Sequence, residues 1–150
     1  YMPRKKRDHA GRLVFILNHH LPKNWQIKSL DNLTESDVIK FLNKSKIFLS
    51  FSELEGFGLP PVEAALCGNH VIGYTGESGK EYWKPPIFDE VFSGDLRTFA
   101  NKIITKIKGF NKNNHIFDNF EPHVSKLAEK YSTEKEQRGL LSLIDLVKNF

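Results

Sequence analysis

Nearly unbroken apolar runs alternate along the chain with segments of helical periodicity. Residues 46–51 (KIFLSF) and 70–74 (HVIGY) are almost wholly apolar, which is typical of strands covered on both faces of a sheet. Residues 25–30 (WQIKSL) predict a further short strand, and residues 1–3 predict the end of another. The strands lie far enough apart for a helix to connect each one to the next.

Helical periodicity fills the segments between these runs. Residues 10–21 predict a helix whose expected core side chains are Leu13, Ile16, Leu17 and His20. Residues 33–45 predict a helix with a capping-box pattern, Thr34 followed by Asp37. Its expected buried face consists of Val38, Phe41 and Leu42. A short helix over residues 60–66 stops at Gly68, and an amphipathic helix runs over residues 95–109.

The C-terminal part, residues 118–150, predicts two more helices. Thr133 and Glu136 form a second capping-box pattern there. One side of the last helix is expected to expose Leu140, Leu141, Ile144 and Val147. Because strands that alternate with helices pair in parallel through right-handed crossovers, the predicted fold class is α/β, a Rossmann-like parallel sheet with helices on both faces.

The composition is that of one soluble globular domain covering residues 1–150. The chain is 39% hydrophobic and 27% charged, and no apolar run approaches the roughly 20 residues of a membrane span. A single cysteine, Cys67, allows no internal disulfide and predicts a buried thiol in a reducing, cytoplasmic setting. The opening residues YMPRKKR contain no signal peptide, and we expect the sequence to be part of a longer protein.

The net charge of +4 permits an anionic partner. The densest basic cluster is Arg4, Lys5, Lys6 and Arg7. It lacks the aromatic residues or binding motif that nucleic-acid recognition usually adds, so we expect no nucleic acid and keep the cluster as a phosphate-binding candidate. The sequence offers no metal-ligand cluster either, because the adjacent His19 and His20 do not face one ligand.

A glycine-rich loop leads from the strand at residues 46–51 into the helix at residues 60–66. Gly56 and Gly58 allow a sharp turn and a close approach by a ligand. Pro60 and Pro61 suit the first helical positions but carry no N–H. The free amide donors are therefore those of Gly56, Phe57, Gly58 and Leu59. Beside the positive end of a helix dipole, they predict a phosphate or diphosphate seat.

Two glutamates flank this loop. Glu55 and Glu63 would repel a phosphate at close range, but a carboxylate accepts hydrogen bonds from sugar hydroxyls. Either glutamate alone would be an ordinary surface or helix-dipole residue; with the glycine loop between them, we interpret the pair as binding a nucleotide sugar. Two alternatives stay open: Ser78 and Gly79 bind phosphate or only turn the chain, and the aromatic residues at 82–83 stack on a base or pack in the core.

The segment SELEGFGLPPVEAALCG, residues 52–68, resembles the signature of retaining GT-B glycosyltransferases of the large family 4 type, the group 1 glycosyl transferases. That signature has one glutamate, seven residues and a second glutamate, with Gly-Phe-Gly after the first. The preceding SDVIKFLNKSKIFLSFS, the following CGNHVIGYTGESGKEYW and the initial YMPRK are also similar to the family. The resemblance covers about residues 1–110.

The resemblance implies a role for each matching residue. Glu63 would bind the ribose hydroxyls and Glu55 the donor sugar, while the amides of Gly56, Phe57 and Gly58, with Leu59 nearby, would line the sugar and the distal phosphate. Arg4 and Lys5 would stabilise the departing nucleoside diphosphate, and Lys6 or Arg7 is an alternative to Lys5. In the family this basic pair replaces a metal, so neither a metal nor a cofactor is expected.

The implied protein is a retaining hexosyltransferase of which this chain is the donor-binding half of a GT-B fold. The N-terminal acceptor domain would be missing, and the chain alone would transfer little sugar. The implied acceptor is a glycan or lipid-linked saccharide, as in polysaccharide or lipopolysaccharide biosynthesis, with peripheral association at the inner face of the membrane. The alternatives are a non-catalytic nucleotide-binding module and an α/β interaction domain. A dinucleotide fold is disfavoured because no G-x-G-x-x-G follows the first strand.

Overall fold

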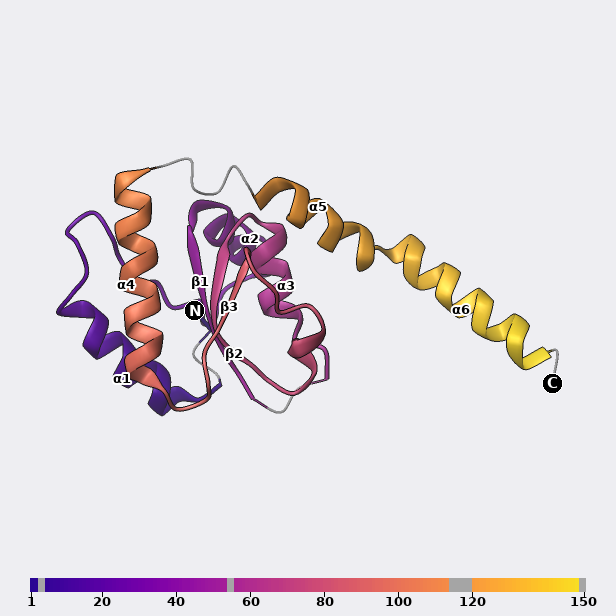
Figure 1. The fold of residues 1–150 in the computed structure, drawn as a ribbon, viewed down its shortest axis with the longest axis horizontal. Coiled ribbons are helices and arrows are strands. Elements are labelled where there is room, and N and C mark those ends of the chain that lie inside the picture. Colours follow the sequence, from indigo (N-terminus) through magenta and orange to yellow (C-terminus); the bar gives the residue numbers. More distant parts are fainter. Residues whose placement is uncertain (3–4, 54–55, 114–119, 149–150) are drawn as a thin grey trace.

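The computed structural model describes residues 1–2, 5–53, 56–113 and 120–148 of the 150. Its sheet has three parallel strands in the order β1 (Ile47–Ser52), β2 (His70–Thr75) and β3 (Phe88–Glu90) (Figure 1). Ile47 pairs with His70, and Val71 pairs with Phe88. The predicted α/β class with a parallel sheet is therefore confirmed. The sequence pattern missed β3, whose three residues are too few to show a period.

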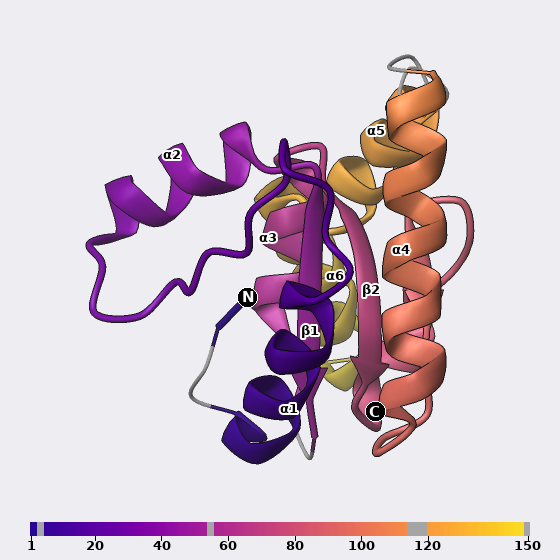
Figure 2. The same ribbon diagram turned by 90° about the vertical axis from the view of Figure 1, so that its left-hand side faces the viewer.

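Helices cover both faces of this sheet (Figure 2). One face carries α1 (Arg7–Asn18) and α4 (Leu96–Lys112). The other carries α2 (Glu35–Lys44), α3 (Leu59–Leu66) and α5 (Glu121–Lys130), with the 3₁₀ turn η1 (Ser78–Glu81) beside them. The last helix, α6 (Thr133–Lys148), projects away from this body (Figure 1).

Each face of the sheet has its own hydrophobic core. Between the sheet and α1 and α4, the buried side chains include Leu13, Leu17, Ile72, Phe99 and Ile103. On the opposite face they include Leu42, Phe48, Val71, Phe88 and Leu127. Burying one such side chain stabilises the fold by about 1.5–3 kcal/mol. These two layers hold the loops at the carboxyl ends of the strands in place.

Two predicted strands are wrong. Residues 25–30 are irregular, and residues 1–2 belong to no strand. Their backbones nevertheless meet, because the Tyr1 nitrogen donates to the Lys28 carbonyl at 3.0 Å and the Leu30 N–H donates to the Tyr1 carbonyl at 2.8 Å. A strand needs a longer ladder than this single pairing.

Three details of the predicted helices also need correction. His20 lies beyond the end of α1 and is exposed, with its Nδ1 2.9 Å from the Ile16 carbonyl oxygen, so it does not face the core. Helix α4 continues past Gly109 to Lys112, because Phe110 is buried. Thr133 is already inside α6, and the Oγ of Ser132 accepts the Lys135 N–H at 3.3 Å, so the second capping box is misplaced by one residue.

The first capping box is confirmed. The Thr34 hydroxyl precedes α2, accepts the N–H of Asp37 at 3.3 Å and donates to the Asp37 carboxylate at 2.7 Å. Leu42 is buried on the predicted face, and Val38 and Phe41 are partly buried. The side chain of Thr34 therefore caps the N-terminus of α2.

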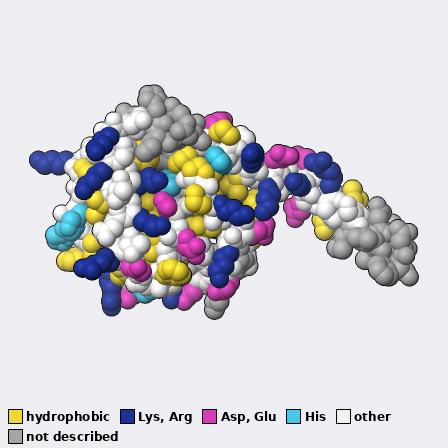
Figure 3. Space-filling model, viewed as in Figure 1, with side chains coloured by type: hydrophobic (Ala, Val, Ile, Leu, Met, Phe, Trp, Pro, Cys, Tyr) yellow, Lys and Arg dark blue, Asp and Glu magenta, His cyan; other side chains and the backbone are white. Residues whose placement is uncertain are grey.

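Charged side chains are dispersed over the described part of the face shown in Figure 3. In Figure 3, lysine and arginine alternate with aspartate and glutamate on the face shown, without one large basic area on its described part. Within the described ranges, no helix is both long and apolar enough to span a membrane.

Candidate functional site

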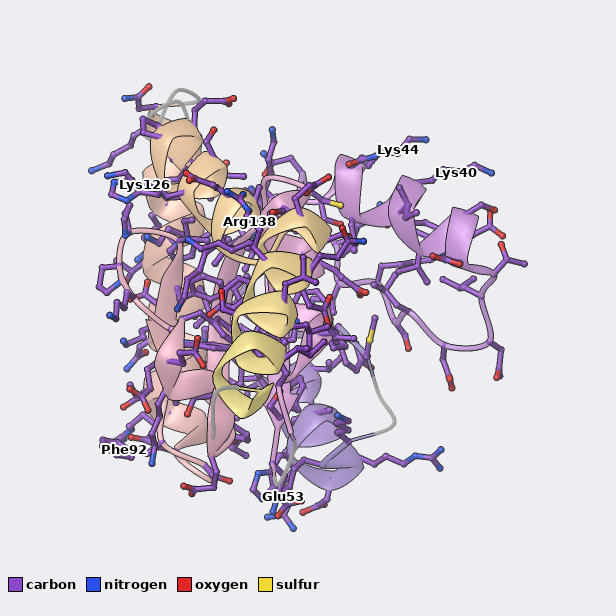
Figure 4. All side chains as sticks on the ribbon, turned by 90° about the vertical axis from the view of Figure 1, so that its right-hand side faces the viewer. Lys40, Lys44, Glu53, Phe92, Lys126 and Arg138 are labelled. Atoms are coloured by element: carbon purple, nitrogen blue, oxygen red, sulfur yellow. The ribbon has the colours of Figure 1, made fainter. Side chains whose placement is uncertain are left out.

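The candidate site lies at the carboxyl edge of the sheet. Glu53, directly after β1, and Phe92, two residues after β3, both lie toward the lower edge of the molecule in Figure 4. In open parallel α/β sheets, ligands bind at this edge because the loops that leave the strands enter the helices there. The loop after β1 carries the predicted glycines.

Gly58 forms the turn into α3. Its φ of 74° is left-handed, a conformation that glycine adopts without a steric penalty, and α3 begins at Leu59 as its first helical residue. Pro60 and Pro61 follow, so the first turn offers few amide donors beyond Gly58 and Leu59. A Cβ added to Gly56 would meet no atom within 4 Å, so there is open space beside the loop.

Tyr82 holds the glycine loop in place through a hydrogen bond and a ring contact. The Tyr82 hydroxyl donates to the Gly58 carbonyl at 2.9 Å, and the Tyr82 ring lies 5.2 Å from the ring of Phe57. Tyr82 and Trp83 are both buried. Packing is therefore the correct interpretation of this aromatic pair, and neither ring is available to stack on a base.

Glu63 points into solvent from the second turn of α3. The side chain is exposed and makes no hydrogen bond or ion pair with other residues that the structure describes. Its charge, after burial, is the second cause that raises the pKa of the Cys67 thiol, which is partly buried. The carboxylate oxygens of Glu63 can therefore accept hydrogen bonds from a ligand.

Lys5 is placed beside the start of α3. It lines a pocket of about 260 Å³ together with Ser52, Pro60 and Pro61, along the edge of β1. The pocket also contains apolar side chains and the polar Asn32; its further lining residues include Met2, Leu33, Val38 and Phe48. The geometry thus joins a cation, the end of β1 and the first turn of α3.

The two alternatives to Lys5 are placed differently. Lys6 adopts a left-handed φ of 45° before α1 and forms an ion pair with Glu53, so its charge is already partly balanced. Arg7 is the first residue of α1 and is exposed. Two predicted site residues, Arg4 and Glu55, lie outside the described residues.

Gly76 is a site residue that the sequence motifs do not single out. Its φ is +64°, and a Cβ there would lie 2.5 Å from the Glu53 carbonyl oxygen. The loop after β2 therefore touches the backbone that leads from β1 toward the glycine loop. The sequence signal was a glycine two residues after the strand predicted at residues 70–74, which indicates a close backbone approach.

His9 and Tyr74 form a second contact at this edge that sequence reasoning missed. The His9 Nδ1 lies 3.2 Å from the Tyr74 hydroxyl, and their rings meet edge to face. Burial raises the pKa of the Tyr74 hydroxyl, while the nearby charge of Lys6 acts in the opposite direction. A lone histidine and a tyrosine in an apolar run carry no motif, so no sequence signal joins them.

Metal ligands do not cluster at this edge. Within residues 1–2, 5–53, 56–113 and 120–148, no group of three or more His, Cys, Asp and Glu side chains could hold a metal ion.

Comparison with known proteins gives one family match. The model of the family described as "Glycosyl transferases group 1" matches residues 15–116. An "Alpha-1,6-glucosyltransferase" of Actinobacillus pleuropneumoniae is 33% identical over 85 residues, which cover 55% of this chain and 26% of that protein. The "Serotype-specific mannosyltransferase WbdA" of Escherichia coli is 37% identical over 75 residues, 49% of this chain and 9% of that protein.

A third relative comes from a virus. The "Putative glycosyltransferase ORF378" of Acidianus filamentous virus 2 is 42% identical over 43 residues, covering 29% of this chain and 11% of that protein. The aligned segments span about a quarter or less of these relatives. No solved structure matches the chain.

Proposed function

The chain belongs to the group 1 glycosyl transferases, and on this premise we propose that it binds a nucleotide sugar and provides the donor site for transfer of that sugar to an acceptor. The observation that carries the proposal is the position of Lys5. This lysine shares a pocket with the end of β1 and the first turn of α3, the helix that also presents the exposed Glu63.

In the proposed complex, the diphosphate occupies the start of α3. The amides of Gly56, Phe57, Gly58 and Leu59 donate to its oxygens, and Lys5 and Arg4 balance its charge. Lys5 is favoured over Lys6 as the second cation, because Lys5 lines the pocket at the start of α3 and Lys6 does not. The pocket of about 260 Å³, whose mostly apolar lining also includes Lys5, Asn32 and Ser52, accepts the nucleoside base.

The glutamates bind hydroxyl groups in this proposal. Glu63 accepts hydrogen bonds from the ribose, since its carboxylate is exposed and unshared with described side chains. Glu55 contacts the donor sugar. The two carboxylates lie on either side of the phosphate seat along the chain, which suits a ligand with one sugar at each end of a diphosphate.

Catalysis in this proposal is electrostatic. Negative charge develops on the departing diphosphate as the glycosidic C–O bond breaks, and the loop amides together with Arg4 and Lys5 stabilise it without a metal. The transition state is oxocarbenium-like. The acceptor hydroxyl attacks from the same face that the diphosphate leaves and passes its proton to an oxygen of the departing diphosphate, so the anomeric configuration is retained.

The proposed complete enzyme has two Rossmann-like domains in a GT-B arrangement. Residues 1–150 form its donor-binding domain, and an N-terminal acceptor domain completes the cleft, so this chain alone transfers little sugar. The relatives' printed names, a glucosyltransferase and a mannosyltransferase, support a hexose donor. The proposed acceptor is a glycan or lipid-linked saccharide, reached at the inner face of a membrane.

A thermal-shift screen tests this proposal. The chain is heated with UDP, GDP, ADP and their glucose or mannose derivatives in the presence of EDTA. Ligand at 100 times its Kd stabilises a protein by about 2.7 kcal/mol, so one nucleotide should raise Tm by roughly 5 °C or more. Lys5→Ala should remove most of the shift, and Lys112→Ala, an exposed lysine at the end of α4, should keep it.

The screen also separates the alternatives. If no nucleotide stabilises the folded chain, the donor-site proposal is wrong and an interaction domain becomes the better account. If a nucleotide binds but a longer protein that contains this chain transfers no sugar, the non-catalytic binding module is the better account.

A further inference from the structure

An aromatic cluster joins the glycine loop to the C-terminal helices. The Phe57 ring, in the loop, lies 5.2 Å from Tyr82 and 4.7 Å from Tyr131. Tyr131 directly follows α5, and its ring also meets that of Tyr82 edge to face at 6.2 Å. Tyr131 lies outside residues 15–116, the part that matches the family model.

Glu81 holds Tyr131 in this position. The Tyr131 hydroxyl donates to the Glu81 carboxylate at 2.8 Å, and the Lys130 ammonium donates to the same oxygen at 2.9 Å. Both hydrogen bonds favour the charged carboxylate and lower the pKa of Glu81. Glu81 belongs to η1, directly before Tyr82, whose own hydroxyl donates to the Gly58 carbonyl.

We propose that Tyr131 is a positioning residue that holds the glycine loop in its ligand-binding conformation, acting through the ring of Phe57 and through Glu81 and Tyr82. Phe57 is only partly buried, so without the Tyr131 ring one side of its own ring loses its contact. Gly56 and Gly58 supply little conformational restraint of their own, which makes the loop dependent on the rings that anchor it.

The proposal couples α5 to the donor site. Helix α5 packs against α3, contributes Leu127 to the core on that face of the sheet, and is followed at once by Tyr131 and α6. A shift of the junction between α5 and α6 would move Tyr131 and release Phe57. The expected effect of Tyr131 on ligand binding rests on the proposed function. Its expected effect on the conformation of the glycine loop does not.

Selective isotope labelling makes the loop directly observable. The dipeptide Phe-Gly occurs once in the sequence, at residues 57–58. A chain labelled with carbonyl-¹³C phenylalanine and ¹⁵N glycine therefore gives one correlated amide signal, that of Gly58. Tyr131→Ala should shift or broaden this signal and weaken nucleoside diphosphate binding by about three- to tenfold, the cost of ordering one or two more side chains.

Conservative and control variants separate positioning from a general loss of structure. Tyr131→Phe keeps the ring contact with Phe57 but loses the hydrogen bond to Glu81, so it should shift the Gly58 signal less than Tyr131→Ala does. Tyr82→Phe removes only the hydroxyl that holds the Gly58 carbonyl and should shift the signal in a chain that stays folded. Phe15→Ala, which truncates an exposed ring on α1, should leave it unchanged.

The outcomes are distinct. If Tyr131→Ala is folded and its Gly58 signal matches that of the wild type, Tyr131 does not position the loop. If Tyr131→Ala does not fold, an unchanged Gly58 signal in Tyr82→Phe overturns the proposed link instead. If the Gly58 signal shifts but the wild-type chain binds none of UDP, GDP and ADP, the positioning role stands and the proposed donor site fails.

Discussion

At the scale of single residues, the site depends on backbone contacts that only glycine allows. Gly58 turns into α3 with a left-handed φ, and Gly76 brings the loop after β2 against the Glu53 carbonyl. These contacts set how closely the loops after β1 and β2 approach each other. The side chain of Glu63 then projects from a helix whose start is fixed in space.

Gly76→Ala should lower the free energy of unfolding by about 1–3 kcal/mol, because a Cβ at φ +64° is strained and would collide with the Glu53 carbonyl oxygen. Urea denaturation measures the change. Gly139→Ala is the matched control: it lies within α6, where a Cβ meets no atom within 4 Å, and should not destabilise the chain. Equal stability of Gly76→Ala and the wild type would show that the close approach of Gly76 to Glu53 does not stabilise this edge.

The lowered pKa of the buried His70 predicts that the folded chain loses stability in mild acid. Burial lowers its pKa, although the hydrogen bond to Asp89 at 2.9 Å acts in the opposite direction. The unfolded chain therefore binds a proton more readily as the pH falls through the ordinary histidine pKa of about 6.5, and the folded state loses stability below that pH.

The measurement is the free energy of unfolding between pH 7.5 and 5.5. His70→Gln should flatten its dependence on pH, whereas His123→Gln, an exposed histidine in α5, should keep the wild-type slope. Asp89 adds a separate effect: its hydrogen bond from His70 lowers its pKa to about 2, so stability falls further between about pH 4 and 2. A wild-type slope in His70→Gln would show that His70 is not the responsible group.

At the scale of elements, a helix is predicted best from the sequence where its hydrophobic periodicity and its capping residues agree. Residues 33–45 show both an apolar face and the Thr34–Asp37 pattern, and α2 forms there. Residues 25–30 have the composition of a strand, but the pairing that makes a strand is a long-range property that a local pattern does not contain. For the same reason, the sequence pattern did not predict β3 or the contact between Tyr131 and Phe57.

The Thr34 cap should contribute measurably to stability. Thr34→Ala leaves the Asp37 N–H without its side-chain acceptor and should lower the free energy of unfolding by about 1 kcal/mol. Urea denaturation again measures the loss. Ser125→Ala, an exposed serine inside α5, serves as the control and should change stability little. If both variants unfold alike, α2 does not depend on this cap.

At the scale of the whole molecule, the two C-terminal helices contribute unequally to the fold. Phe120, directly before α5, and Leu127 within it are buried in one of the two cores. Helix α6 projects from the body and exposes Leu140, Leu141 and Ile144, three of the four residues predicted there. The side chain of the fourth, Val147, lies outside those that the structure describes. The position of the candidate site could likewise be predicted from the sequence of the glycine loop. The contacts of Tyr82 and Tyr131 with that loop could be found only from the three-dimensional structure.

Two truncations test this division. Removal of residues 133–150 should leave the thermal midpoint of the remaining chain nearly unchanged, because none of the α6 side chains that the structure describes belongs to either core. Removal of residues 118–150 also deletes Phe120 and Leu127 and should cost about 3–6 kcal/mol, at about 1.5–3 kcal/mol for each side chain. Equal midpoints for both truncated chains would show that α5 is not part of the core.

The most direct test of the donor site is calorimetric titration of the chain with the nucleoside diphosphate that stabilises it best, in EDTA. Glu63→Ala should weaken binding at least tenfold, since it removes the carboxylate proposed to hold the ribose. Glu35→Ala, which removes an exposed carboxylate at the start of α2, should bind as the wild type does. Wild-type affinity in a folded Glu63→Ala chain would contradict the account.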